Sequence, residues 1–299
     1  MMINLNAIAL AMAALAAQPA QDEEAERDDP VLTPYLITWG VRDTNIDRDQ
    51  DKIHSTGFVY GAGLEYRSDE DKPLFEATYE IAKHSYSNFD EYDRVSHELT
   101  GIYHHKFSDL WRADMLVELS SKGSSEDRDV NDTLSLQPRF EYRITDDDRL
   151  KLRGNYRWRT PPDDPNGKNQ NRYAEFIYEK KLPNNNSIAA GVRYEINRAT
   201  SDANHYDRIS YSIEWEAEPT PRDEFSIELK FRDRKYTVRE VTKGVRRQDD
   251  SIVVSADWEH CFNEKLSLLF DYRMETRKSN DSDENFVQHV FGLGVKLRF

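Results

Sequence analysis

Charged side chains recur at every second position along several segments of the chain, a spacing that could support an electrostatic function. Alternate side chains of a β-strand point to the same face, so residues spaced in this way would share one surface. The basic set is Arg139, Arg143, Lys151, Arg153, Arg157, Arg159 and Arg193. The acidic set is Glu76, Glu80, Asp114, Glu118, Glu214, Glu228 and Asp271. Opposed basic and acidic walls around water would create a transverse field that orders ions and polar solutes.

Other residues that could do chemistry lack the partners that a metal or catalytic site requires. Asp43–Asp51 offers oxygen ligands at every second position, as a calcium loop does. Arg48 stands where an EF-hand needs glycine and His54 where it needs glutamate, so an EF-hand is rejected. A loose calcium or lipopolysaccharide-bridging site and a solvated loop stay open as alternatives. We predict no catalytic residue, no metal ion and no cofactor, and we do not expect an enzyme.

The elements that must position these charges are strands. From Thr33 onward, about ten residues of alternating polarity are repeatedly followed by a turn. The apolar face comprises Tyr35, Ile37, Trp39 and Val41 in the first segment, and Phe58, Tyr60, Ala62, Leu64 and Tyr66 in the second. In the segment 172–181 the alternation does not show which set of residues forms the apolar face. We predict an all-β fold, a transmembrane antiparallel up-and-down β-barrel of about fourteen strands, with twelve or sixteen as alternatives.

The connections between these segments alternate in length. Short ones such as Thr145–Asp148 lie between longer ones such as Asp43–Thr56 and Asp233–Asp250. Short turns at one end and long loops at the other are typical of an outer-membrane barrel. Pro138 falls in mid-strand, and because proline cannot donate to the ladder we expect a bulge or a strand end there.

The C-terminal segment alternates in the same way. Its apolar face comprises Phe291, Leu293, Val295, Leu297 and Phe299, while Lys296 and Arg298 point to the opposite face. This pattern resembles the closing strand of Gram-negative outer-membrane β-barrels, where a terminal Phe is part of the signal read by the barrel-assembly machinery. The resemblance implies that machinery as a partner.

The N-terminal residues and the composition fit export to the outer membrane. An apolar run over residues 7–17 followed by small residues predicts a cleaved signal peptide over 1–20. We expect an acidic periplasmic tether over 21–32 and the barrel over 33–299. Sixteen Tyr, 13 Phe and 5 Trp would supply the aromatic girdles at the membrane interfaces. A net charge of -15 disfavours nucleic acid, and the expected surroundings are outer-membrane lipid and lipopolysaccharide.

Two shorter resemblances suggest further functions. Trp39–Ile46 resembles the first strand and loop of barrels with an Asp-x-Asn-Ile/Val signature, which include polysaccharide-associated porins and the barrel domain of surface-lipoprotein assembly modifiers. Ala82–Asn88 resembles the His-x-Ser-Asn segment of outer-membrane phospholipases and lipid A deacylases, with Ser87 one residue too far from His84.

Three hypotheses follow from the sequence. The preferred one is a passive, porin-like channel for small polar or anionic solutes, saccharides among them, with the basic set lining the route. The alternative is a non-conducting assembly or interaction barrel whose lumen is closed by ion pairs. A membrane-embedded lipid hydrolase is the third. The sequence does not indicate the oligomeric state, and with a single cysteine, Cys261, the chain forms no internal disulfide.

Overall fold

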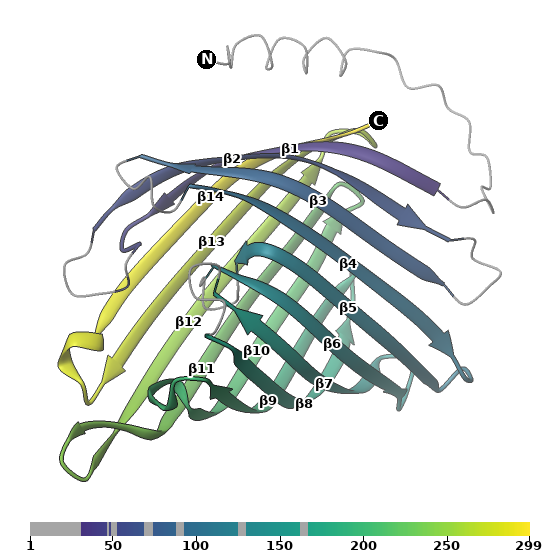
Figure 1. The fold of residues 1–299 in the computed structure, drawn as a ribbon. Helices are drawn as coiled ribbons and strands as arrows, with labels where there is room; N and C mark the ends of the chain where they lie inside the picture. The colour runs from purple at the N-terminus through teal and green to yellow at the C-terminus, as the bar shows by residue number, and fades with distance from the viewer. Residues whose placement is uncertain are drawn as a thin grey trace.

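The computed structural model describes residues 31–46, 48, 53–68, 74–87, 93–124, 130–161 and 167–299. The predicted signal peptide and nearly all of the predicted tether lie outside the described residues. The described part forms one closed antiparallel barrel (Figure 1), in which β1 pairs with both β2 and β14. The predicted all-β barrel of about fourteen strands is confirmed.

The strands follow one another around the wall in chain order. They are β1 Val31–Asp43, β2 Ser55–Arg67, β3 Phe75–Tyr86, β4 Arg94–Lys106, β5 Trp111–Ser124, β6 Val130–Arg143, β7 Asp148–Thr160, β8 Asn169–Leu182, β9 Asn186–Ala199, β10 Tyr206–Thr220, β11 Asp223–Thr242, β12 Val245–Cys261, β13 Leu266–Ser279 and β14 Phe286–Arg298. Two short 3-10 helices, η2 Asp202–Asn204 and η3 Ser282–Glu284, lie in the β9–β10 and β13–β14 connections.

The outer face of the wall is apolar and exposed. On β10, Ile209, Tyr211, Ile213 and Trp215 point outward, and β2 presents Phe58, Tyr60 and Leu64 in the same way. Large apolar side chains exposed over a whole wall would be unfavourable in water, because their burial stabilises a protein by about 25 cal/mol per Å². Lipid acyl chains are the environment that fits this belt. Among the described residues, no helix is long and apolar enough to span a membrane.

The predicted orientation of β1 is wrong. Tyr35 and Trp39 point into the barrel, and Leu36 points outward. Each ring lies over a glycine of a neighbouring strand, Tyr35 over Gly63 of β2 and Trp39 over Gly294 of β14, where an added Cβ would collide with the ring. The Tyr35 hydroxyl donates to Glu80 at 2.8 Å. The two glycines thus make room for rings inside the barrel, and a periodicity read from β1 alone cannot detect them.

The tight turns share a local mechanism. Ser108, Thr145, Thr220 and Asn263 each open a turn and accept a backbone N–H two or three residues later. Such side chains stabilise turns by replacing a backbone acceptor. Between β8 and β9 the three-residue turn instead uses two residues of positive φ, Asn184 and Asn185, a conformation that asparagine adopts more readily than most residues. These turns all lie at one end of the barrel, called here the turn end; the opposite end is the loop end.

Two sequence predictions about strand ends are corrected. The predicted long loop Asp233–Asp250 is mostly strand, since β11 and β12 continue to a two-residue turn at Lys243–Gly244. β-Branched residues within this stretch favour the extended hairpin, which reaches beyond the neighbouring strands at the lower left of Figure 1. At Pro138 the strand neither ends nor bulges: it pairs with Met115 of β5, and Gly154 of β7 leaves space for the proline ring.

Candidate functional site

The predicted basic residues lie together on the inner face. Arg139 and Arg143 are on β6, Arg193 is on β9, and β7 carries Lys151, Arg153, Arg157 and Arg159. We call the four β7 residues the cationic ladder. Alternate residues along a strand are roughly 6.8 Å apart, so the ladder follows the barrel wall for most of its height.

The ladder is only partly neutralised. Arg153 and Arg193 approach Glu175 of β8 at 3.8 and 3.2 Å, and Lys151 pairs with Glu179. Arg157 reaches Glu118 of β5 at 3.9 Å.

Arginines of this wall keep unused hydrogen-bond donors. Arg139 directly opposes Arg153 in the strand register, and Arg159 is only 7% exposed. Neither Arg139 nor Arg159 forms an ion pair within the described part of the chain. The buried Nε atoms of Arg139, Arg157 and Arg159 have no hydrogen-bond acceptor there either. Guanidinium groups in this state attract carboxylates, phosphates and sulfates.

The predicted acidic residues also point inward, but on other strands. Glu76 and Glu80 lie on β3, Asp114 and Glu118 on β5, Glu214 on β10, Glu228 on β11 and Asp271 on β13. Asp114 accepts from Arg112 at 2.8 Å and lies 2.7 Å from His104. Glu214 and Glu228 directly oppose each other. The turn-end half of β10 and β11 is therefore acidic.

A second basic cluster lies on the inner face of β10–β13, at the loop end. It comprises Arg208, Lys230, Arg232, Arg234, Arg247, Arg273 and Arg277. Only the acidic residues Glu214, Glu228 and Asp271 were predicted on these strands from the sequence, so this basic cluster was missed. Arg208, Arg232 and Arg234 share the strand parity of Glu214 or Glu228, so their alternation could have revealed them. Arg247 could not be found in this way, because it lies in the stretch predicted as a loop.

This second cluster is packed rather than open. Arg208 and Glu195 form a 2.7 Å ion pair with both side chains 3% exposed, and Arg247 holds Asp249 at 2.7 Å. Val253 of β12 and Val290 of β14 are buried on the same inner face, where they oppose Lys230 and Arg273. Burying such charges is tolerable only when they are paired and hydrogen-bonded. The loop-end half of this wall is thus filled by its own side chains.

Comparisons with known proteins agree with this geometry. The family model "Putative beta-barrel porin 2" matches residues 224–299. No curated protein matches the chain. A loop-deletion mutant of OmpT, an outer membrane protein of Vibrio cholerae, has a TM-score of 0.53 at 10% identity, covering 91% of this chain and 100% of that one.

Two further solved structures share the barrel. The anion-selective porin from Comamonas acidovorans has a TM-score of 0.51 at 8% identity, over 91% of this chain and 100% of that one. A bacterial polysaccharide outer membrane secretin has a TM-score of 0.51 at 12% identity, over 89% and 98%. The chain has the fold of porin-like outer-membrane β-barrels. At these identities the likeness concerns the fold.

The seam that closes this porin-like barrel is held from inside at the loop end. The Gln288 amide on β14 donates to both carboxylate oxygens of Asp43, at 3.0 and 2.8 Å, and to the Asn45 carbonyl at 2.9 Å. The Asn45 N–H donates to Asp43 at 2.8 Å. Asp43 and Asn45, the first and third residues of the Asp-x-Asn signature, therefore link β1 to β14 by hydrogen bonds.

These contacts bear on the suggested calcium loop. The Asp43 carboxylate is already occupied by amide donors, while Asp47, Asp49 and Asp51 lie outside the described residues. Within the described ranges, no group of three or more His, Cys, Asp or Glu side chains could hold a metal ion.

The predicted assembly signal lies on the outer face of β14. Phe291, Leu293 and Phe299 are exposed, whereas Leu297 is buried between Leu36 and Leu266 of the neighbouring strands. Recognition by the assembly machinery stays a prediction. On the inner face, Lys296 and Arg298 both pair with Glu65, so the seam is also held at the turn end.

The histidine of the hydrolase-like segment has a different partner from the one its spacing suggested. His84 Nε2 lies 2.9 Å from Ser96 Oγ on the inner face. Ser87 instead accepts the Thr56 N–H through its hydroxyl. Ser96 is buried, so its hydroxyl is closed to a lipid substrate.

Proposed function

We propose that the barrel is a passive channel for small polar or anionic solutes, anionic saccharides among them. The observation that carries this proposal is the exposure of inner-face charges at mid-height. Arg153 and Glu118 are each 34% exposed, and Glu98 and Asp257 are exposed as well. Charges inside a dry, plugged barrel would be buried, so this exposure supports a wet lumen.

The direction of the ion pairs also supports an open passage. Three ion pairs join strands that are separated by one other strand: Arg157–Glu118, Lys296–Glu65 and Arg232–Glu275. A fourth, Arg193–Glu175, joins neighbouring strands. Pairs of this kind run along the wall. They hold the lining side chains in place and leave the axis of the barrel unbridged.

The cationic ladder gives the route its selectivity. An anion leaving one cation of β7 meets the next roughly 6.8 Å further along, except between Arg153 and Arg157, where Asn155 intervenes and the step is roughly 13.6 Å. Several weak sites therefore replace one strong one. Conduction needs sites that bind well enough to admit a solute and weakly enough to release it. The Comamonas porin of the same fold is described as anion-selective, and the polysaccharide secretin agrees with a saccharide solute.

Planar bilayers test this proposal. The purified protein should give stepwise conductance with a preference for chloride over potassium, and Arg153→Glu with Arg157→Glu should reduce or reverse that preference. Arg42→Glu is the matched control, because Arg42 is exposed on the outer face. A folded barrel that passes no current would contradict the proposal.

A non-conducting interaction barrel is the second candidate, and the packed loop-end half of β10–β14 favours it. Glu275, Gln288, Val253 and Val290 are all buried there. If this packing continued across the lumen, the wild-type protein would be silent in bilayers even when fully folded.

A further inference from the structure

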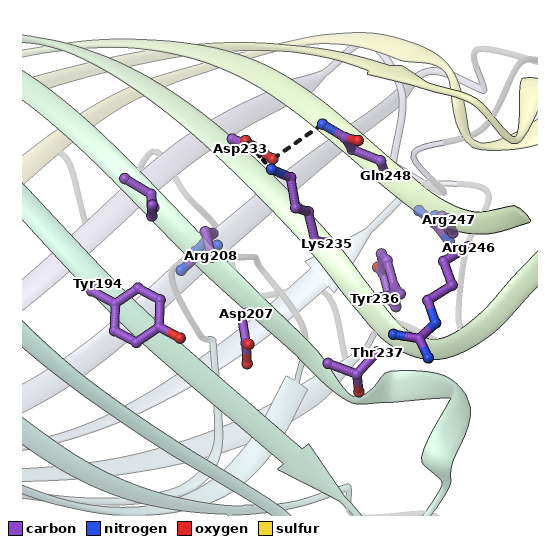
Figure 2. Close-up of a pocket in the computed structure, with 11 residues that line it drawn as sticks. Tyr194, Asp207, Arg208, Asp233, Lys235, Tyr236, Thr237, Arg246, Arg247 and Gln248 are labelled. Carbon is purple, nitrogen blue, oxygen red and sulfur yellow. Dashed lines mark hydrogen bonds and ion pairs between the residues drawn. The ribbon is translucent and has the colours of Figure 1, made fainter.

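A groove of about 420 Å³ lies on the outer wall at the loop end, across β9, β10, β11 and β12. Figure 2 shows the side chains that surround it: Tyr194 and Asp207 come from β9 and β10, while Lys235, Thr237 and Arg246 come from the long β11–β12 hairpin. The inward-pointing Arg208, Tyr236 and Arg247 are buried behind it. The groove is thus separate from the lumen.

The charged groups in the groove differ in whether they have an ion-pair partner. Asp207 pairs with Arg198 at 2.9 Å, and Asp233 accepts from Lys235 at 3.2 Å and from Gln248 at 3.4 Å. The Arg246 guanidinium has no partner within the described part of the chain. Both acids are therefore paired with cations. Arg246 presents an unpaired positive charge near Thr237, whose hydroxyl donates to the His205 carbonyl at 3.4 Å.

The height of the groove on the wall indicates which ligand it meets. Ile209 forms part of the groove, and Tyr211 and Ile213 continue the same outward face of β10 toward mid-membrane. An apolar wall directly below a groove with one unpaired cation matches the boundary between acyl chains and head groups. At the loop end of an outer-membrane barrel, that boundary is in the outer leaflet.

We propose that this groove binds a phosphate group of lipid A, with Arg246 and Lys235 holding the phosphate and Tyr194 and Ile209 contacting the adjoining acyl chain. A phosphate monoester offers several acceptor oxygens to Arg246 and Lys235. Lys235 can contact the ligand while it stays paired with Asp233, because its side chain is 64% exposed and its ammonium carries three donors. This site does not depend on whether the lumen conducts.

The test is a titration of the delipidated, folded protein with bisphosphorylated lipid A, counted by native mass spectrometry. Lys235→Gln with Arg246→Gln should weaken binding by about tenfold, since each cation near an anionic lipid surface contributes modestly. Arg42→Gln with Lys83→Gln is the matched control. Both residues are exposed, outward-pointing cations at the loop end of β1 and β3, away from the groove.

Two further arms identify the phosphate source. Dephosphorylated lipid A should bind the wild-type and the groove variant equally, and inorganic phosphate in large excess should not displace intact lipid A. Equal losses in the groove and control variants would overturn the proposal, as would displacement by inorganic phosphate. Heat-dependent gel mobility of each variant verifies that the barrel is folded.

Discussion

At the level of single residues, the turn between β10 and β11 concentrates hydrogen bonds on one carboxylate. Asp223 accepts from the Thr220 hydroxyl at 2.6 Å, lies 2.8 Å from His260 Nδ1 and accepts from the Trp258 indole at 3.2 Å. These hydrogen bonds lower the pKa of Asp223 to about 2, and the bond from Thr220 has the largest effect. The β6–β7 turn repeats the arrangement, with Thr145, Tyr178 and Lys180 around Asp148, whose pKa is also lowered to about 2.

The lowered pKa of Asp223 predicts an acid-sensitive contribution to stability. Because its pKa is below the unfolded value of about 3.9, the ionised carboxylate stabilises the fold fully above about pH 4. That stabilisation is lost as the pH falls toward 2. Asp223→Asn should therefore lower the urea midpoint in lipid vesicles at pH 7, and the difference from wild type should shrink by pH 2.5.

The control for this prediction is Asp146→Asn. Asp146 lies in the equivalent β6–β7 turn, but its side chain is 98% exposed. Its replacement should leave the midpoint unchanged at both pH values. A pH-independent difference for Asp223→Asn would mean that its effect does not come from the carboxylate charge.

At the level of elements, the seam between β1 and β14 determines whether the barrel closes. Gln288 is buried and supplies the side-chain donors that hold the buried Asp43 carboxylate. Gln288→Ala leaves that carboxylate with unmet acceptors, which costs about 1–3 kcal/mol. We expect the urea midpoint to fall accordingly, whereas Gln170→Ala, which removes an exposed amide from the outer face, should have little effect. Equal midpoints for the two variants would show that the seam is held by the backbone ladder alone.

The strands show what alternation can and cannot predict. Charged residues are strongly unfavourable against lipid, so the apolar residues of β6 and β7 identify the outer face of each strand. Arg139 and Arg153 alternate with those residues and were therefore predicted to point inward. The predicted orientation of β1 was wrong because its aromatic side chains point into the barrel, over Gly63 and Gly294. Those glycines belong to other strands, and only the pairing register brings them opposite Tyr35 and Trp39. A single strand carries no information about that register.

At the scale of the whole molecule, the inner face divides into zones that no single strand reveals. The basic wall of β6–β7 reaches solvent at Arg153, while the second basic cluster is buried around Arg208 and Arg247. Alternation can place both sets inside the barrel. Which of them is wet depends on how side chains from strands far apart in sequence fill the lumen, and this packing cannot be predicted from parity.

Cys261 offers a test of whether the wet zone continues through the barrel. It is the only cysteine in the chain, and it points inward at the turn end, 3.5 Å from Ser267 Oγ and 3.7 Å from a Glu259 carboxylate oxygen. Arg298 lies beside the same carboxylate at 3.7 Å. A negatively charged thiol reagent bound here would narrow the passage and offset the positive charge of Arg298, so single-channel current should fall in one step on reaction.

The side from which the reagent acts is the decisive measurement. In an open passage, an anionic methanethiosulfonate added at the loop end travels along the cationic ladder to Cys261, so the current should fall whichever side receives it. If the packed half of β10–β14 sealed the lumen, only the turn side would react. Cys261→Ser should be insensitive from both sides, which excludes reaction elsewhere. If mass spectrometry showed that Cys261 had reacted while the single-channel current stayed unchanged, Cys261 would lie outside the conducting path.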